Sequence, residues 1–504
     1  MRRLFARSLL LALVGFSALF GLEFFLELHR AGFPDPTATS WAGVNNAKLV
    51  DILSPMARAY NNVLAMLLAT IGLAIPLTAN MHTPTLIDLF LRDRINRIVL
   101  SFMALGAGHV LWVDYMIGPE FAPTWAVALA VYFAIAGWVI LIPYFFYVVR
   151  FLEPSTVISR LREENVATLA RVAAHKVAPS VGQAAVAARI DQLGTIVLKS
   201  LDRGDRAVAR EGIWALKQLV DEHARHKPTM PAAWFEVDRA DFVGRSQEAL
   251  DMLTESRTWC EMSCLWQMWL AYQQCLSKTS DVVSSISDAS RVVAIHAAAR
   301  GDDEALRLCI RFFNNFLREA IKSKNPHAVY DTFHQYRLLG RELCDRPERL
   351  RELGQHFLYY AQMARTYGLA FAPQLAVFDL GYVVRRAYEA GSPAAAALLG
   401  DVLLLPHRFD KAVQDLAVKA KLILGAFFLE TGRPAEAARV SDNLRDVEPD
   451  EIAQVERELL AADRVFFEVT DRQVNLEYVP PERREPLRRF CTALSHRGDG
   501  PVGE

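Results

Sequence analysis

The sequence predicts an all-α protein with a four-helix transmembrane domain followed by a separate helical domain. Four long apolar segments lie within residues 1–152, and each suits a membrane-spanning helix. In residues 153–477, apolar residues recur at helical spacing with few strand-like runs. Glycine and proline recur between these apolar stretches, as they do where helix pairs stack on one another. We therefore expect residues 153–477 to form an irregular α-solenoid-like, tetratricopeptide-like domain.

The four expected spans cover residues 8–28, 63–79, 98–117 and 125–151. A helix needs about 20 apolar residues to cross roughly 30 Å of hydrocarbon. The first segment follows a positively charged start, as a secretory signal does, but no small-residue cleavage site comes after it. We expect this span to be retained, and its removal would leave the later topology unchanged.

Basic residues set the expected orientation, because cytoplasmic loops of membrane proteins carry an excess of Lys and Arg. The loop at 118–124 has neither residue, and the loop at 29–55 has only Arg30 and Lys48. We expect a multi-pass inner-membrane protein with both termini and the helical domain in the cytoplasm. Six cysteines without a paired framework, all after residue 153, fit a reducing compartment. The basic residues before the first span, between the second and third, and at or after the end of the fourth are Arg2, Arg3, Arg7, Arg92, Arg94, Arg97, Arg150, Arg160 and Arg162.

Four polar residues lie in or near the expected spans: Asn61, Asn62, His109 and Asp114. Polar groups in hydrocarbon are costly and usually face a bundle interior or water. One interpretation is an ion or proton pathway through His109 and Asp114. The other, which we favour, is hydrogen bonding between helices, with Asp114 as an interfacial carboxylate.

A short amphipathic helix is expected between the second and third spans. Pro84 suits a first helical turn, and Leu86 and Phe90 share one helical face. We expect this helix on the cytoplasmic surface of the bilayer, with Arg92 and Arg94 near lipid phosphates. The membrane-interface motif consists of Pro84, Leu86, Phe90, Leu91, Arg92, Asp93 and Arg94.

This motif resembles a family of bacterial predicted membrane proteins of unknown function, which have N-terminal spans and a soluble C-terminal domain. The resemblance covers about residues 57–165 and is strongest from Pro84 to Arg94. Such proteins carry an Ile-Asn-Asp-Pro-like motif in the soluble part, and this chain has only a partial counterpart at 324–327. The resemblance implies location and topology, and it implies no reaction.

One repeat-like unit lies near the C-terminus. Gly425 and Ala437 are expected to let two paired helices approach closely, with Phe428 filling the space between them. The residues at tetratricopeptide spacing are Leu424, Gly425, Phe428, Ala437 and Pro449.

Proline and glycine suggest two further boundaries. Pro228 and Pro231 predict a break near residues 225–245. Pro480, Pro481 and the glycine-rich end predict a disordered tail at 478–504.

Two side-chain clusters in the helical domain have metal-ligand types at helical spacing. Cys260, Cys264 and Cys275 share one helical face, but the segment is apolar nearly all round, so we favour core packing. His223 and His226 lie three residues apart without a partner motif, so we favour a solvated helix end.

Composition and motifs argue against several classes of function. A net charge of −1 gives no global basicity for binding nucleic acid. The chain has no Gly-rich nucleotide-binding loop, nucleophile elbow or zincin motif. We therefore expect a protein that is not an enzyme and has no catalytic, cofactor or metal site.

Two functions fit the expected architecture. The first is a membrane tether for a cytoplasmic helical domain that binds a protein partner. The alternative is a channel or transporter with a cytoplasmic regulatory domain. Four spans are few for a pore in one chain, so the alternative requires a homo-oligomer.

Overall fold

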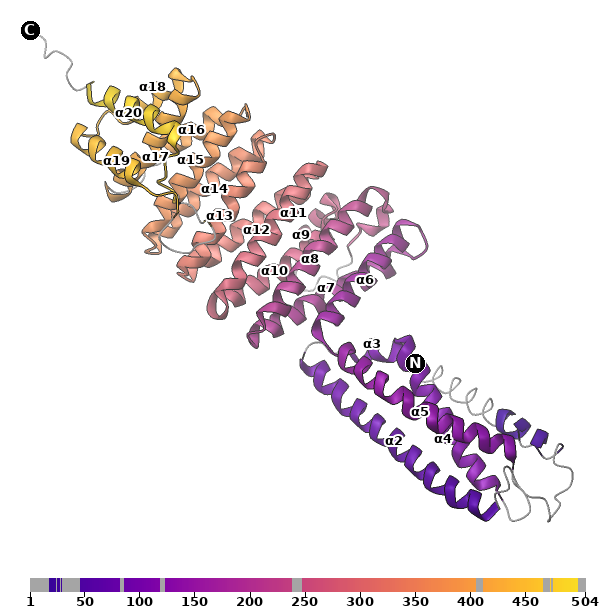
Figure 1. Ribbon diagram of the computed structural model, residues 1–504. Coiled ribbons are helices and arrows are strands. Elements are labelled where there is room, and N and C mark those ends of the chain that lie inside the picture. Colours follow the sequence, from indigo (N-terminus) through magenta and orange to yellow (C-terminus); the bar gives the residue numbers. More distant parts are fainter. Residues whose placement is uncertain are drawn as a thin grey trace, which may run out of the picture. The chain divides into compact units, whose positions relative to one another are not determined.

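The computed structural model describes residues 18–23, 25–27, 29, 46–81, 86–117, 123–237, 247–404, 411–465, 472 and 475–496. The chain divides into two compact units, Met1–Val157 and Ile158–Glu504 (Figure 1). The described residues of both units are almost entirely helical, and none of them forms a β-sheet. The predicted all-α class is therefore confirmed.

Unit 1 contains three described helices that are long and apolar enough to cross a membrane, over Val50–Pro76, Arg94–Met116 and Trp125–Phe151. The expected second span begins earlier than predicted, because its helix continues through Pro55. Most of the expected first span at 8–28 lies outside the described residues, so the fourth crossing stays a prediction. The helices of unit 1 are α2 (Asn46–Met81), α3 (Leu86–Arg92), α4 (Arg94–Met116) and α5 (Thr124–Phe151).

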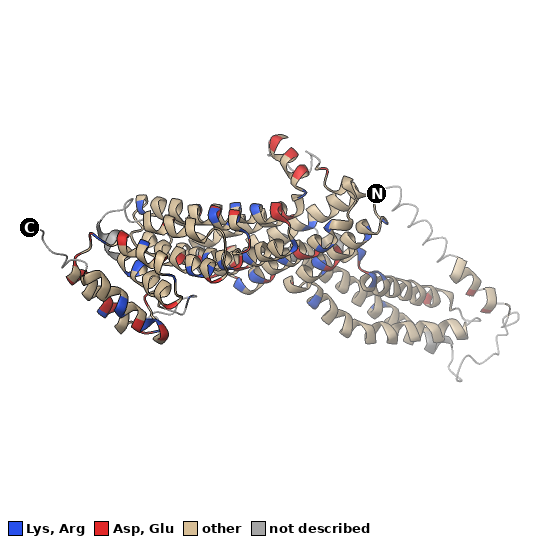
Figure 2. Ribbon diagram, turned by 90° about the horizontal axis from the view of Figure 1, so that it is seen from above, with Lys and Arg blue, Asp and Glu red and all other residues tan. Residues whose placement is uncertain are grey.

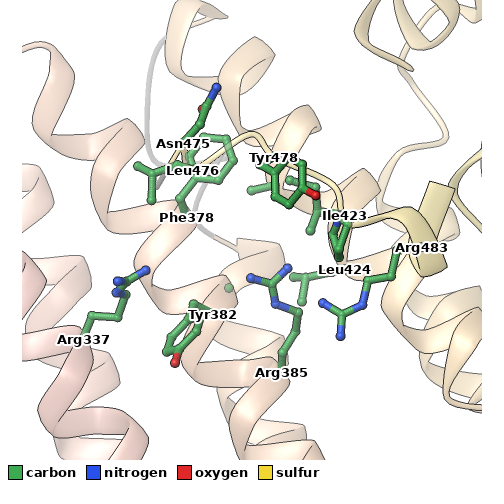
Figure 3. A pocket seen from close by; sticks show the side chains of 13 residues that line it. Arg337, Phe378, Tyr382, Arg385, Ile423, Leu424, Asn475, Leu476, Tyr478 and Arg483 are labelled. Carbon is green, nitrogen blue, oxygen red and sulfur yellow. The ribbon is translucent and has the colours of Figure 1, made fainter. Parts of the chain in front are cut away.

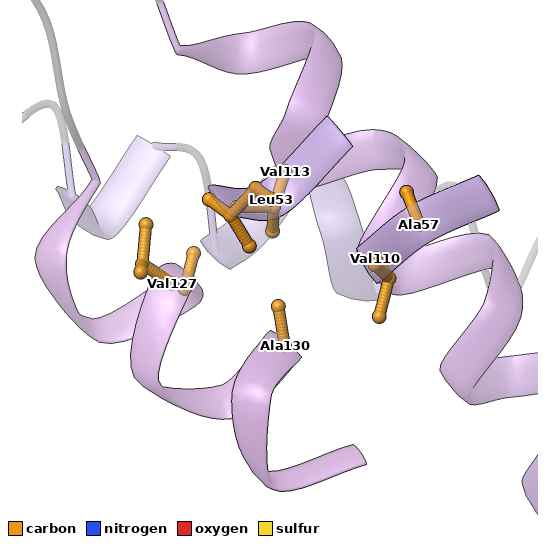
Figure 4. Packing of buried hydrophobic residues seen from close by; sticks show 7 residues of the cluster. Leu53, Ala57, Val110, Val113, Val127 and Ala130 are labelled. Atoms are coloured by element: carbon orange, nitrogen blue, oxygen red, sulfur yellow. The ribbon is translucent and has the colours of Figure 1, made fainter. Parts of the chain in front are cut away.

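Small and β-branched side chains form the core of unit 1. Leu53 and Ala57 of α2 pack with Val110 of α4 and with Val127 and Ala130 of α5 (Figure 4). Small residues let helices approach closely, which is the usual basis of packing in a bilayer.

A tyrosine occupies the second cluster of this core. Tyr60 is 1% exposed and lies against Gly106 and Gly137, where an added Cβ would come within 2.7 and 2.5 Å of the Tyr60 side chain. Large apolar side chains such as Leu73 and Phe146 point outward. Charged residues are sparse along α2, α4 and α5 (Figure 2), which suits a surface that faces lipid.

Unit 2 is built from two rows of helices. In one row α7, α10, α12, α14 and α16 pack in succession, and in the other α8, α11, α13, α15 and α17 do the same. The helices that lie wholly or mostly in this unit are α6 (Pro154–Ala173), α7 (Pro179–Asp202), α8 (Arg206–His226), α9 (Gln247–Ser256), α10 (Trp259–Lys278), α11 (Val283–Arg300), α12 (Asp303–Lys322), α13 (Pro326–Glu342), α14 (Pro347–Thr366), α15 (Phe371–Glu389), α16 (Ala395–Leu404), α17 (Lys411–Glu430), α18 (Pro434–Asn443), α19 (Pro449–Ala461) and α20 (Pro481–Ser495).

A turn between the two rows uses glycine, in keeping with the glycines that recur between apolar stretches of the sequence. Gly301 ends α11 in the left-handed conformation, with φ of 74°, which glycine adopts without steric cost. Asp302 then caps α12 by accepting a hydrogen bond from the Ala305 N–H. The described helices stack in pairs, as the recurring glycines and prolines predict, while tetratricopeptide-like character stays a prediction.

Two expected boundaries differ in the structure. After α8 the chain forms two short 3₁₀ turns, Lys227–Thr229 and Ala232–Trp234, but residues on both sides of the 225–245 segment belong to the same unit. The expected tail at 478–504 contains the helix α20, whose Leu487 and Phe490 are buried. Pro481 starts this helix at a position where its missing N–H costs nothing.

Candidate functional site

A buried histidine and a glutamate meet inside unit 1. The Nε2 atom of His109, on α4, lies 2.8 and 3.0 Å from the two carboxylate oxygens of Glu23. His109 is 1% exposed, and the rings of Phe20 and Phe133 lie 5.4 Å from its ring. Sequence reasoning identified His109 and missed Glu23 as its partner, because 86 residues separate the two.

Two further carboxylates of unit 1 also have partners. The Ser54 hydroxyl donates to Asp114 at 2.5 Å, which joins α2 to α4. Glu27 is 7% exposed and accepts the backbone N–H groups of Trp125 and Ala126 at 2.6 and 3.1 Å. The carboxylate of Glu27 therefore satisfies free donors in the first turn of α5, where negative charge is favoured.

The two asparagines contribute little to this polar set. Asn61 donates to the Ala57 carbonyl of its own helix at 2.9 Å, and Asn62 is exposed. Of the four expected intramembrane residues, only His109 and Asp114 join separate segments. Their contacts agree with hydrogen bonding between helices. A groove of about 460 Å³ also runs beside Glu23, Glu27 and His109, with mostly apolar walls.

The membrane-interface motif forms an elbow between α3 and α4. Phe90 is 1% exposed and packs edge-on against Phe151 of α5, with ring centroids 5.3 Å apart. Asp93 caps α4 by accepting from the N–H groups of Ile95 and Asn96, and it also accepts the Tyr147 hydroxyl at 2.7 Å.

This elbow corrects part of the amphipathic interpretation. Phe90 faces the bundle instead of lipid, because α5 supplies an aromatic partner for it. The side chains of Leu91, Arg92 and Arg94 are exposed. Leu86 begins α3, and Pro84 lies outside the described residues.

The repeat-packing residues lie on α17, α18 and α19, and one has a different neighbour from the one expected. An added Cβ at Gly425 would come within 2.2 Å of Phe490, so this glycine makes room for α20. Phe428 is fully buried and packs edge-on against Tyr388 of α15 at 4.9 Å. Leu424 and Ala437 are also buried, and Pro449 begins α19.

The structure places His223 in the core and overturns its solvated interpretation. Its Nδ1 lies 3.0 Å from Glu261 of α10, and its Nε2 accepts the Trp234 indole N–H at 3.0 Å. An indole can only donate, so we assign the imidazole proton to Nδ1. His223 and Glu261 are 0% and 1% exposed.

The surroundings keep Glu261 ionised. Burial raises the pKa of this carboxyl, but the hydrogen bond from His223 and the charge of Lys227 outweigh burial and hold the pKa below its ordinary value. Lys227 lies 3.5 Å from Glu261 and 2.6 Å from Asp302 of the α11–α12 turn. The cluster therefore joins α8, α10 and α12 as a structural network. The described residues contain no group of three or more His, Cys, Asp or Glu side chains that could hold a metal ion.

A surface groove in unit 2 follows one row of helices. It has a volume of about 580 Å³ and lies along α10, α12 and α14. Trp266 and Tyr359 line it and are 36% and 53% exposed. Arg311 and Arg318 add positive charge, and none of the described lining residues is a carboxylate.

A buried hydrogen-bond network supports the wall of this groove. The Tyr336 hydroxyl donates to Asn314 at 3.1 Å and lies 2.9 Å from Nδ1 of His356. Burial lowers the pKa of His356, so this residue is neutral near pH 7. Sequence reasoning missed the groove, because its residues come from three helices.

The expected resemblance is confirmed by comparison with known proteins. Residues 2–203 match the family described as "Predicted membrane protein (DUF2254)", a wider range than the expected 57–165. No curated protein and no solved structure matches the chain.

Proposed function

We propose that unit 1 anchors a helical domain which binds a protein partner. The match of residues 2–203 to a family of predicted membrane proteins supports the anchoring role. The observation that carries this proposal is the groove along α10, α12 and α14. Exposed aromatic residues and arginines dominate binding energy at protein interfaces. The groove presents both kinds of side chain on three helices that pack against one another.

The chemistry of the groove favours an acidic partner segment with a large apolar side chain. Arg311 and Arg318 are without a carboxylate among the lining residues. Trp266, Phe312 and Tyr359 supply the apolar surface. The inner membrane is the proposed location, with both termini and the groove in the cytoplasm, because exposed Arg92, Arg94 and Arg97 follow the expected orientation rule.

Site-specific photocrosslinking in membranes tests this function. A benzophenone side chain at position 359 should give a discrete crosslinked product in cells. The same group at position 214, where Trp214 is 46% exposed on α8, should not. The double substitution Arg311→Glu and Arg318→Glu should remove the product. Equal crosslinking at both positions, or a product that survives the double substitution, would contradict the proposal.

The second candidate function is an oligomeric channel or transporter, and the Glu23–His109 pair favours it. A carboxylate and an imidazole in contact beside a groove are groups that can relay protons. Proton flux into liposomes containing the protein would support this function if His109→Ala abolished the flux. Liposomes that show no proton flux would leave tethering as the role of unit 1.

A further inference from the structure

A second cavity in unit 2 lies on the other row of helices. It has a volume of about 270 Å³ and is lined by α13, α15, α17 and the segment before α20. Figure 3 shows Arg385 and Arg483 projecting into the same space, with Arg337 beyond Tyr382. Tyr478 lies above them.

Two of these arginines already have carboxylate neighbours. Arg483 contacts Glu430 at 2.5 Å and lies 3.8 Å from Glu389. Arg337 lies 3.7 Å from Asp379, but Arg472 occupies both oxygens of that carboxylate.

Arg385 differs from both. Within the part of the chain that the structure describes, its guanidinium forms no hydrogen bond or ion pair with a carboxylate. Its guanidinium carbon lies 6.0 Å from the centre of the Tyr382 ring. Glu389, one turn along α15, interacts with Arg386 and Arg483.

Partial burial makes this charge costly. Arg385 is half-buried. Burial and the charge of Arg483 outweigh the attraction of Glu389 and lower the pKa of Arg385 to about 10, so the side chain stays charged near pH 7. A partly buried charge without a close carboxylate is unfavourable, and an anion would relieve that cost. Guanidinium groups bind carboxylate and phosphate oxygens in pairs.

The cavity walls restrict the size and character of the anion. A volume of about 270 Å³ lies just below the usual range of about 300–1,000 Å³ for ligand pockets. Phe378, Ile423 and Leu424 give it an apolar side and are buried. Tyr382 and Tyr478 give it aromatic walls. We propose that this cavity binds a small organic anion, with its carboxylate or phosphate on Arg385 and its apolar part against α15 and α17.

Calorimetric titration of the full-length protein in detergent tests the proposal. The probes are phenyl phosphate, benzoate, inorganic phosphate and uncharged benzyl alcohol. Phenyl phosphate or benzoate should bind saturably and more tightly than inorganic phosphate, and benzyl alcohol should not bind. Arg385→Gln should weaken binding by about tenfold or more, since charge-assisted hydrogen bonds are lost. Arg386→Gln, which changes the adjacent exposed arginine, should leave the affinity unchanged.

Short-chain phosphatidic acid separates a lipid headgroup from a free anion. Binding of this lipid without binding of phenyl phosphate or benzoate would overturn the proposal. So would the absence of saturation by all the aromatic probes up to about 10 mM, or equal binding by the wild type and Arg385→Gln.

Thermal unfolding distinguishes a binding role from a structural one. Arg385→Met should raise the melting temperature without anion, because it removes a partly buried positive charge that the charge of Arg483 repels. The same variant should lose the increase that the bound anion gives the wild-type protein. A lower melting temperature together with an unchanged response to the anion would show that Arg385 is structural.

Discussion

The two units bury different kinds of side chain, although both are built from helices. Unit 1 packs mostly alanine, glycine and valine between its helices, with large exceptions such as Tyr60 and Phe90, and turns many large apolar residues outward. Unit 2 buries large aromatic residues such as Trp234, Phe313 and Phe357. Lipid gives large apolar side chains a favourable environment outside the protein, whereas water drives them into the core.

The two units also differ in how their charged side chains are paired. In unit 1 the described intramembrane carboxylates meet small sets of partners, as Asp114 meets Ser54. In unit 2 the cluster of His223, Glu261, Lys227 and Asp302 joins several helices. The comparison predicts large effects from breaking charge clusters in unit 2 and smaller effects from single hydrogen bonds in unit 1.

The largest effect is expected at Glu261. Glu261→Ala removes the carboxylate that faces His223 and Lys227, and should destabilise unit 2 by about 3–5 kcal/mol. Thermal unfolding of the full-length protein measures the loss. Glu222→Ala, which removes a half-buried carboxylate that pairs with exposed Arg225 on α8, serves as the matched control and should cost under about 1 kcal/mol. Similar losses for both variants would contradict the structural role of the buried cluster.

Lowering the pH should protonate the same carboxylate, Glu261, and destabilise unit 2. The pKa of Glu261 is lowered below its ordinary value of 4.5 in the folded protein, so its contribution to stability is present above pH 4.5. That contribution should fall in the window below pH 4.5, as the pH drops through the lowered pKa. The wild-type protein should therefore lose more stability across this window than Glu261→Ala does. Parallel acid unfolding curves would refute the pairing.

An intermediate effect is expected from filling the space beside Tyr60. Gly137→Leu forces a side chain against the Tyr60 ring, and should destabilise unit 1 by about 1–3 kcal/mol. Gly72→Leu on α2, where an added Cβ meets nothing within 4 Å, is the matched control. Unfolding in mixed micelles compares the two, and equal stability would show that Tyr60 moves aside freely.

The smallest effect is expected at Ser54. Ser54→Ala removes the hydrogen bond to Asp114, and should cost about 0.6 kcal/mol, the average for such bonds in membrane proteins. Thr70→Ala, which removes a bond to the backbone of its own helix, should cost less in the same assay. A loss as large as that of Glu261→Ala would erase the proposed contrast between the units.

Helical class and membrane character were predictable, because hydropathy and helical period are properties of neighbouring residues. The turn at Gly301–Asp302 was likewise visible in the sequence, since its left-handed glycine and its capping aspartate are local features. The prediction of a disordered tail was wrong for residues 481–495, because Pro480 and Pro481 can indicate either a break or a helix start. Only the contact of Phe490 with α17 reveals that α20 is packed.

The partners of individual polar groups required the tertiary structure. His109 could be noted as a costly residue in a span, but Glu23 approaches it only after the chain has folded. The sequence by itself determined that this is a helical protein of the membrane, because about 20 consecutive apolar residues have few other environments. The pairing of charges depends on helices that are far apart in the chain, so only the packing of those helices decided it. Arg385, which has no close carboxylate among the described residues, is one example.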